Sequence, residues 1–309
     1  MIAARLVRTA GLLALPAALL APPEARACSV CACGDPLAAI AETPGNQGAL
    51  RLTLEAESLT MTAGSESMPG MTDELTQWTL RPSVVWSPLP SLNLVATAPL
   101  TNKRMDETGM GMDSTMSDLS GLGDVELGVR WFPFESVDFA ARLRQSGAVM
   151  AGSSFPTGSN DAASNGVRVD ENGQLGTGGF GPYLGLFYRL SGDAWSGFAT
   201  FTGRVRTENS YGYRYGESLH WALQGQWQAG SWFAASLSFE GRSAAADRED
   251  GAPVPNTGGL VLAATPAVHF NVLAGAWLFA RAQLPFYTAL LGEQTVGPVF
   301  TAGIRYEAL

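Results

Sequence analysis

The sequence predicts an all-β protein, a transmembrane antiparallel β-barrel of about twelve strands. From about residue 50 onwards, apolar and polar residues alternate strictly within short segments, as they do on the two faces of a strand. The connections between these segments are alternately short and long, which is typical of single-chain outer-membrane barrels. A soluble β-sandwich has turns of similar length at both ends, so the connections favour the barrel.

The alternation is clearest in the segment 124–131. One face carries Val125, Leu127, Val129 and Trp131, and the other carries Asp124, Glu126, Gly128 and Arg130. A helix would mix these two sets, because its side chains repeat every 3.6 residues. The same test predicts strands at residues 49–59, 75–87, 91–100, 120–132, 137–151, 176–190, 195–207, 215–228, 232–242, 259–270, 275–286 and 297–308.

The connections divide into two classes. Short turns are expected at 87–90, 133–136, 191–194, 229–231 and 271–274. Longer and mostly polar connections are expected at 60–74, 101–119, 152–175, 243–258 and 287–296. Both chain termini belong to the side with the short turns. This arrangement predicts a bacterial outer-membrane protein with periplasmic N- and C-termini, in contact with the lipid bilayer.

Composition agrees with this fold class. Charged residues make up 15% of the chain, the mean hydropathy is +0.07 and glycine occurs 36 times. No segment after the N-terminal region contains the roughly 20 consecutive apolar residues that a spanning helix needs. The formal net charge of -9, with basic residues dispersed over the predicted strands, argues against a nucleic-acid partner.

The N-terminal region reads as a cleaved secretory signal at residues 1–27. Arg5 and Arg8 precede an apolar run at 12–21, and Ala25-Arg26-Ala27 has the small-x-small pattern of a cleavage site. The chain then divides into a cysteine-containing periplasmic segment at 28–47 and the barrel at 48–309.

Three glycine-containing motifs lie at predicted strand ends. They are Ser120-Gly121-Leu122-Gly123-Asp124, Ser154-Phe155-Pro156-Thr157-Gly158 and Leu175-Gly176-Thr177-Gly178. In this order the motifs resemble those of the outer-membrane transporter barrels of the meta-pathway phenol degradation family, over roughly residues 45–309. The resemblance implies a barrel channel for small solutes and names no catalytic residue.

Arginine supplies almost all of the positive charge, the exception being Lys103 in a predicted loop. The candidate lumen residues on or near polar strand faces are Arg51, Arg81, Arg130, Arg142, Arg144, Arg204, Arg206, Arg281 and Arg305, with His220 and His269. One interpretation is an arginine-lined passage that attracts anions. The alternative is an internal ion-pair network that fills a narrow lumen, because acidic residues share the same faces: Glu55, Glu57, Asp124, Glu126, Glu240 and Glu307.

All three cysteines lie close together as Cys28, Cys31 and Cys33. Thiolates at this spacing favour soft ions such as Cu(I) or Zn(II), so one interpretation is a metal site that docks a periplasmic partner. A local disulfide that leaves one free thiol is a second interpretation, and lipidation of Cys28 is a third.

Methionines gather in the first two long connections. Met61, Met68 and Met71 fall in the first, and Met105, Met110, Met112 and Met116 fall in the second. Thioether sulfur is a soft ligand, which suggests an external Cu(I) capture site. The alternative is that these side chains only supply adaptable apolar contacts.

No enzyme is predicted, because the sequence has neither a G-x-S-x-G elbow nor an H-E-x-x-H motif. The leading functional hypothesis is a channel for a small solute or ion that handles a soft metal through the cysteines and the outer methionines. A general porin for small aromatic or anionic solutes is the first alternative. A structural or electron-transfer partner barrel that transports nothing is the second.

Overall fold

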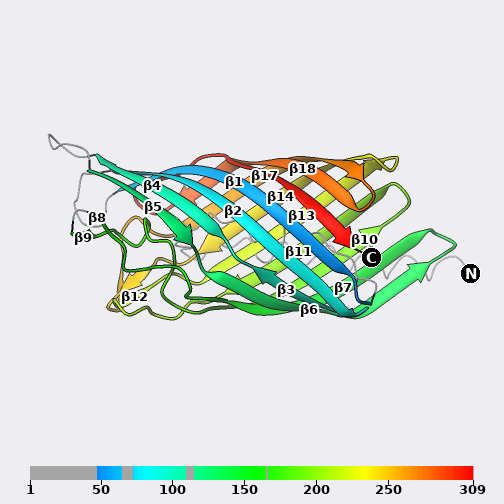
Figure 1. Cartoon of the computed structure of the whole chain (residues 1–309), viewed down its shortest axis with the longest axis horizontal. Coiled ribbons are helices and arrows are strands. Elements are labelled where there is room, and N and C mark those ends of the chain that lie inside the picture. The colour runs from blue at the N-terminus through cyan, green and yellow to red at the C-terminus, as the bar shows by residue number, and fades with distance from the viewer. Residues whose placement is uncertain (1–46, 65–71, 109–114, 165, 309) are drawn as a thin grey trace, which may run out of the picture.

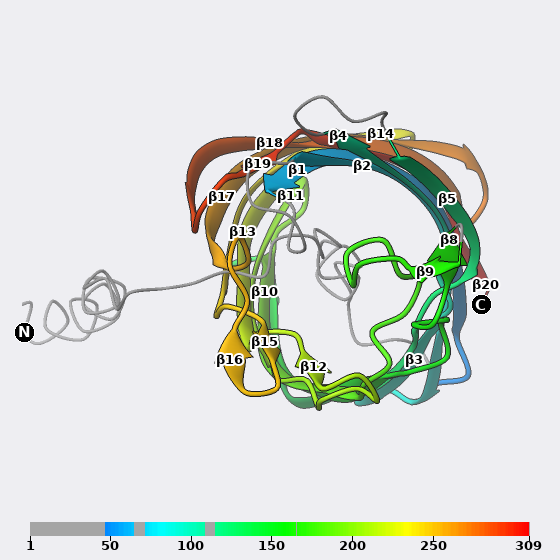
Figure 2. The same cartoon turned by 90° about the vertical axis from the view of Figure 1, so that its left-hand side faces the viewer.

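A computed structural model describes residues 47–64, 72–108, 115–164 and 166–308, and these form a closed antiparallel β-barrel of twelve spanning strands (Figures 1 and 2). The spanning strands are β1 (Leu50–Gly64), β2 (Thr72–Leu89), β3 (Leu92–Thr97) continued by β4 (Leu100–Thr108), β5 (Thr115–Leu122) continued by β6 (Val125–Asp138), β7 (Leu143–Phe155), β10 (Gly181–Ser191), β11 (Trp195–Arg204), β13 (Ser218–Ala229), β14 (Phe233–Ala244), β17 (Gly259–Leu273), β18 (Ala276–Leu290) and β20 (Val299–Ala308). The shorter strands are β8 (Ala163–Ser164), β9 (Val167–Arg168), β12 (Tyr213–Arg214), β15 (Arg248–Glu249), β16 (Ala252–Pro253) and β19 (Gln294–Val296). The predicted fold class is confirmed.

The first and last strands close the barrel. β1 pairs with β2 on one side and with β20 on the other, so that Leu54 lies opposite both Pro82 and Ile304. Closure removes the sheet edges, which would otherwise leave unpaired backbone groups in contact with lipid. The C-terminus lies at the end of the barrel opposite β8, β9 and β12 (Figure 1). Within the described residues there is no helix with the length and hydropathy for a membrane span.

The outer surface is apolar and the inner surface is mostly polar, as the alternation predicted. On β10, Leu184 is 63% exposed on the outside, whereas Tyr183 and Phe187 point inward and are buried. Exposed tryptophans lie near the end with the short turns: Trp86, Trp195, Trp227 and Trp232. Aromatic side chains at this level form the girdle that barrels place at a membrane interface.

One predicted turn is wrong. β6 continues through 133–136 and ends at Asp138, and the turn follows at 139–142, where Arg142 has a φ of 51°. The Asp138 carboxylate accepts hydrogen bonds from the N–H groups of Ala140 and Ala141, both at 2.9 Å. Pro133 lies at a bulge between Trp131 and Phe134, which accommodates a residue that cannot donate a ladder hydrogen bond.

Two predicted long connections are largely strand. β1 and β2 remain paired to Gly64 and Thr72, and β4 and β5 pair from Leu100 and Leu122 to Glu107 and Thr115. Lys103, predicted in a loop, lies in β4. The outward face of these extensions is mostly polar and the inward face carries Met61 and Met105, so they lack the apolar outward face by which the other strands were recognised.

The barrel wall is irregular between β5 and β7. β6 pairs with β7, but in the described part of the chain β5 pairs only with β4. β7 ends at Phe155, and the segment 156–180 folds across part of the barrel mouth (Figure 2, green). The glycine-containing motifs lie at this irregularity.

Candidate functional site in the barrel lumen

The three glycine-containing motifs meet around Asp124, between β5 and β6. The Asp124 carboxylate accepts hydrogen bonds from the backbone N–H of Gly158 at 3.1 Å and of Thr177 at 2.9 Å. The Thr177 hydroxyl donates a third at 2.6 Å. Hydrogen bonds to a charged acceptor are stronger than neutral ones. We call the set Gly123, Asp124, Thr157, Gly158, Gly176 and Thr177 the glycine junction.

Glycine is required in the junction because two backbones touch there. A Cβ atom on Gly158 would lie 2.7 Å from the Cα atom of Gly176, and a Cβ on Gly176 would meet the Gly158 carbonyl oxygen. The Thr157 hydroxyl accepts a hydrogen bond from Val125 N–H at 2.8 Å and donates one to the Gly123 carbonyl at 2.9 Å. The junction therefore ties the end of β7 and the segment before β10 to the interrupted strand.

Lys103 secures the same segment from inside the barrel. Its ammonium group donates to the carbonyl oxygens of Asn172 at 3.0 Å and Gln174 at 2.5 Å. Burial, opposed by the nearby charge of Arg168, raises the pKa of Asp170 above its usual value. The segment 156–180 is thus packed against the mouth of the barrel.

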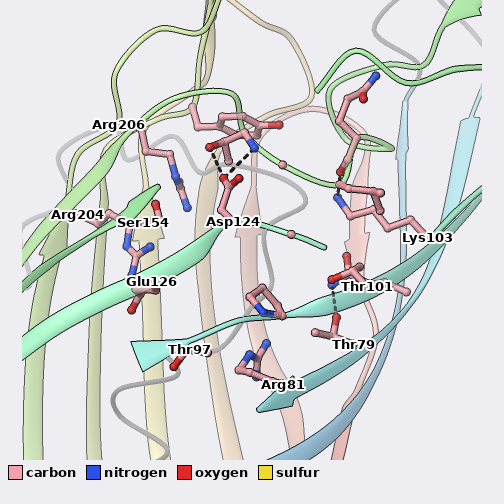
Figure 3. Close-up of a pocket in the computed structure, with 18 of the residues that line it drawn as sticks. Thr79, Arg81, Thr97, Thr101, Lys103, Asp124, Glu126, Ser154, Arg204 and Arg206 are labelled. Carbon is pink, nitrogen blue, oxygen red and sulfur yellow. Dashed lines mark hydrogen bonds and ion pairs between the residues drawn. The ribbon is translucent and has the colours of Figure 1, made fainter. Parts of the chain in front are cut away.

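A cavity of about 150 Å³ lies in the lumen below the junction (Figure 3). Arg204 and Arg206 lie on one side of the cavity and Lys103 lies on the other. The Asp124 side chain, which belongs to the junction, lies between them. The other lining residues are Gln77, Thr79, Arg81, Thr97, Pro99, Thr101, Gly123, Glu126, Ser154, Gln174, Leu175, Gly176, Thr177, Thr202, Tyr215, His220 and Arg242.

Several lining charges are paired. The Arg81 guanidinium lies 3.5 Å from a Glu55 oxygen and 3.3 Å from a Glu57 oxygen, and all three side chains are buried. Arg281 lies 3.9 Å from the same Glu55 oxygen. Arg204 and Glu126 are 2.7 Å apart. The ion pairs of the predicted internal network are therefore present on one part of the wall.

The Tyr183 ring lies on the inner wall over Gly152 and Gly128, which we call the glycine track. A Cβ atom on Gly128 or Gly152 would overlap the Tyr183 side chain. Because these glycines lack side chains, the ring reaches across β7 and β6 to pack with Val85 and Val95. The Arg204 guanidinium lies 5.0 Å from the Tyr183 ring centroid, a cation–π distance.

Deeper in the lumen is an apolar cluster. Phe132 meets Phe187 edge-on with centroids 6.4 Å apart, and Phe187 lies 5.8 Å from Phe198. Ala148 and Met150 complete the cluster. We call these five residues the lumen aromatic cluster. All five side chains are buried against one another, each with at most 6% of its surface exposed, and they make this part of the inner wall apolar.

Arginines also gather towards the end with the short turns. Arg51 is paired with Glu307 at 2.5 Å, and Arg144 with Glu135 at 2.6 Å. Arg305 lies directly across from Thr53, whose side chain is also inward. Arg189 was not predicted as a lumen residue, although it lies on the same face of β10 as Phe187.

Ten of the eleven predicted lumen residues lie on the inner face of the barrel or beside it. Arg51, Arg81, Arg130, Arg144, Arg204, Arg281, Arg305, His220 and His269 alternate with outward residues on their strands, and Arg206 follows β11 and lines the cavity. The prediction for Arg142 is wrong, because this residue lies in the turn after β6 and pairs with Asp193 at 2.9 Å. That hydrogen bond raises the pKa of the Arg142 guanidinium.

The two histidines have different surroundings. His220 lines the cavity, and the charges of Arg204, Arg206 and Arg242 are close enough to act on its ring. His269 lies 3.4 Å from the Ser236 hydroxyl and stacks at 6.1 Å on Phe279.

The methionines do not form one outer site. Met61 and Met105 are 4% and 1% exposed and pack with Leu59 and Leu75 in an apolar cluster. Their placement in loops is wrong, since they lie in β1 and β4. Met116 is 51% exposed in β5. The other predicted ligands, Met68, Met71, Met110 and Met112, lie outside the described residues.

The cysteine site falls outside the described part of the chain, because Cys28, Cys31 and Cys33 precede residue 47. Among the described residues, no group of three or more histidine, cysteine, aspartate or glutamate side chains is arranged to hold a metal ion.

Several lumen side chains were not named as candidates from the sequence: Tyr183, Arg189, Thr202, Arg242 and the three phenylalanines of the lumen aromatic cluster. Arg189 and Arg242 follow the alternation of their strands and could have been found by it. Thr202 falls on the polar face of the strand predicted at 195–207, but threonine is common at inward positions of a barrel, so the sequence does not single it out as a site residue. Tyr183 depends on the register that places Gly152 and Gly128 beside it.

Comparison with solved structures supports the fold. The chain is similar to the COG4313 outer membrane channel from Pseudomonas putida F1, with a TM-score of 0.63 and 13% identity, over 85% of this chain and 97% of that one. The translocator domain of the autotransporter NalP from Neisseria meningitidis matches with a TM-score of 0.45 and 13% identity, over 85% of this chain and 89% of that one. No protein-family model matches the sequence, and no curated protein does. The chain therefore shares the barrel fold of the Pseudomonas putida protein.

Proposed function

We propose that this protein is an outer-membrane channel for a small solute. The observation that carries the proposal is a closed barrel with an apolar outer surface and a polar cavity of about 150 Å³ inside it. In such barrels the lipid-facing positions need only be apolar, whereas the inward positions set size and charge selection. The fold shared with the Pseudomonas putida channel adds support.

The membrane orientation proposed here places both termini in the periplasm. The beginning of β1 and the end of β20 lie opposite each other, at the end where the short turns lie. Longer connections, including the segment 156–180, are at the other end, which in outer-membrane barrels faces outward.

We further propose that the solutes that pass through the barrel are aromatic. The resemblance to the phenol degradation transporters implies such a class. The lumen aromatic cluster supports it, because Phe132, Phe187 and Phe198 make part of the inner wall apolar.

The purified full-length protein, reconstituted in a planar bilayer, tests the channel. The cavity lining contains five cationic and two acidic side chains, so we expect a KCl gradient to give a reversal potential shifted towards that of chloride. A reversal potential shifted towards potassium would contradict the proposed charge selection. Membranes that carry folded protein yet show no conductance would contradict the channel itself.

Soft-metal handling remains a separate proposal that rests on Cys28, Cys31 and Cys33. Titration of Cu(I) under reducing conditions into the mature protein and into a triple cysteine-to-serine variant tests it. The proposal expects binding that the variant loses. Equal binding, or none, in both proteins would rule out the cysteine site, while leaving the channel proposal intact.

A further inference from the structure

We infer that the outer part of the lumen contains a binding site for the carboxylate group of an apolar monocarboxylic acid, with Thr202, His220 and Arg242 at its centre. The inference rests on the proposed channel function and names the solute class that the passage selects.

The three central residues form one row across the inner wall. In the strand register, Thr202 on β11 lies opposite His220 on β13, and His220 lies opposite Arg242 on β14. Neighbouring strands are separated by about 5 Å, so the row spans about 10 Å of wall. All three residues line the cavity.

Positive charge is in excess around this row. Arg81 and Arg281 are offset by Glu55 and Glu57, and Arg204 is paired with Glu126. Asp124, which is held by the neutral groups of the glycine junction, then leaves one negative charge against the positive charges of Lys103 and Arg242. The Arg242 guanidinium makes no ion pair or side-chain hydrogen bond with any other residue in the described part of the chain. Lys103 donates to two carbonyl oxygens, which do not cancel its charge. An anion in the cavity would complement this excess.

Thr202 points to a ligand independently of charge. Its side chain is 2% exposed and lines the cavity, and its hydroxyl has no hydrogen-bond partner among the described residues. A buried hydroxyl without a partner is unfavourable, so such groups usually bind water or a ligand. A carboxylate has two oxygens, one for the hydroxyl and one for a guanidinium.

The wall beside and below the row favours an apolar body on the acid. Phe187 lies opposite Thr200, one inward step of about 7 Å from Thr202 along the barrel wall. Phe198 lies a further step in the same direction and belongs to the lumen aromatic cluster. Both rings are buried and neither lines the cavity, so the apolar body of an acid held at Thr202 and Arg242 would meet the apolar part of the cavity lining, which is Pro99, Leu175 and Tyr215.

Benzoate, used as a blocker of chloride current through the full-length protein in a planar bilayer, tests the site. Benzyl alcohol is the neutral control of the same shape, and octanoate tests an alkyl body in place of a ring. Arg242→Gln removes the charge and Thr202→Val removes the hydroxyl. Arg248→Gln, in the short strand β15, is the matched arginine control outside the cavity.

We expect saturable block by benzoate and at least tenfold weaker block by benzyl alcohol. Arg242→Gln should raise the half-blocking concentration about tenfold and Thr202→Val about fivefold, with Arg248→Gln like the wild type. Stronger block by octanoate than by benzoate would assign an alkyl acid, and the reverse an aromatic acid; both support a carboxylate site.

Equal block of wild type and Arg242→Gln by benzoate, in folded and conducting proteins, would overturn the site and leave the channel proposal standing. Block by benzyl alcohol as strong as that by benzoate would do the same. If the wild type does not conduct, the channel proposal fails. Calorimetric titration of benzoate into the detergent-folded wild type and Arg242→Gln then decides the site separately: binding weakened by the substitution supports it, and equal or absent binding overturns it.

Discussion

Replacement of Asp124 by alanine is expected to lower the free energy of unfolding by about 3 kcal/mol. The substitution removes three hydrogen bonds to a charged acceptor and leaves the N–H groups of Gly158 and Thr177 without their partner. Asp124→Asn should lower the free energy of unfolding nearly as much. Both carboxylate oxygens of Asp124 accept a hydrogen bond from an N–H group, and the NH2 group of asparagine cannot accept one. Thr177→Val, which keeps the backbone bond to Asp124 and removes the hydroxyl bonds to Asp124 and Gly179, should cost about 1 kcal/mol.

Urea unfolding of the barrel in liposomes measures these differences, and hydrogen exchange locates them. Exchange of the Gly158 and Thr177 amides should accelerate in Asp124→Ala, while that of the central strands changes less. Asp161→Asn is the matched control, because this carboxylate belongs to the same segment and bonds only locally, to Ser159 at 2.8 Å. An Asp124→Ala protein as stable as the Asp161→Asn protein would contradict a structural role for the junction.

Substitution of Gly128 by alanine is expected to destabilise the barrel by about 1–3 kcal/mol, as overpacking does elsewhere. The new methyl group would overlap the Tyr183 hydroxyl and push the ring into the lumen. We therefore also expect a lower conductance. Gly152→Ala should be at least as harmful, because its methyl group would meet the Leu127 carbonyl oxygen as well as the Tyr183 ring.

The two glycines should respond differently to removal of the ring. Tyr183→Ser should relieve most of the cost of Gly128→Ala, for which Tyr183 supplies the two closest contacts. It should relieve only part of the cost of Gly152→Ala, since the backbone contact remains. Double-mutant cycles on unfolding free energy measure this coupling. Gly225→Ala is the control, because a Cβ at that position has no heavy atom within 4 Å. If the effects of Gly128→Ala and Tyr183→Ser on the unfolding free energy are additive, then the position of the Tyr183 ring does not depend on the absence of a side chain at Gly128.

The glycine junction also affects access to the proposed carboxylate site. It holds the segment 156–180 at the mouth, and the proposed carboxylate site lies in the cavity directly below. Variants that loosen the junction should therefore change access to the cavity without altering the row of Thr202, His220 and Arg242. The positions of the three glycine motifs along the chain do not reveal this contact, since residues 124 and 177 are far apart in sequence.

The sequence was sufficient to predict which segments form strands and which side chains of each strand face the lipid. A spanning strand in lipid must be apolar on one side, so the alternation of residues such as Val125 to Trp131 follows directly from the environment. This constraint ends beyond the membrane. The extensions of β1, β2, β4 and β5 have a mostly polar outward face and were predicted as loops, which also misplaced Met61, Met105, Met116 and Lys103. Pro133 was read as a turn because a bulge and a turn both accept proline.

The sequence by itself determined that this chain forms a barrel of about twelve strands with arginines on its inner face, because alternation is a local property set by the lipid and by the two-residue repeat of a strand. Only the tertiary structure decided which charges cancel and which remain. The register of β1 and β2 places Arg81 beside Glu55 and Glu57, with which it forms ion pairs. The registers of β11, β13 and β14 place Arg242 in one row with His220 and Thr202. Register and barrel closure bring distant residues together, and no local pattern encodes those neighbours.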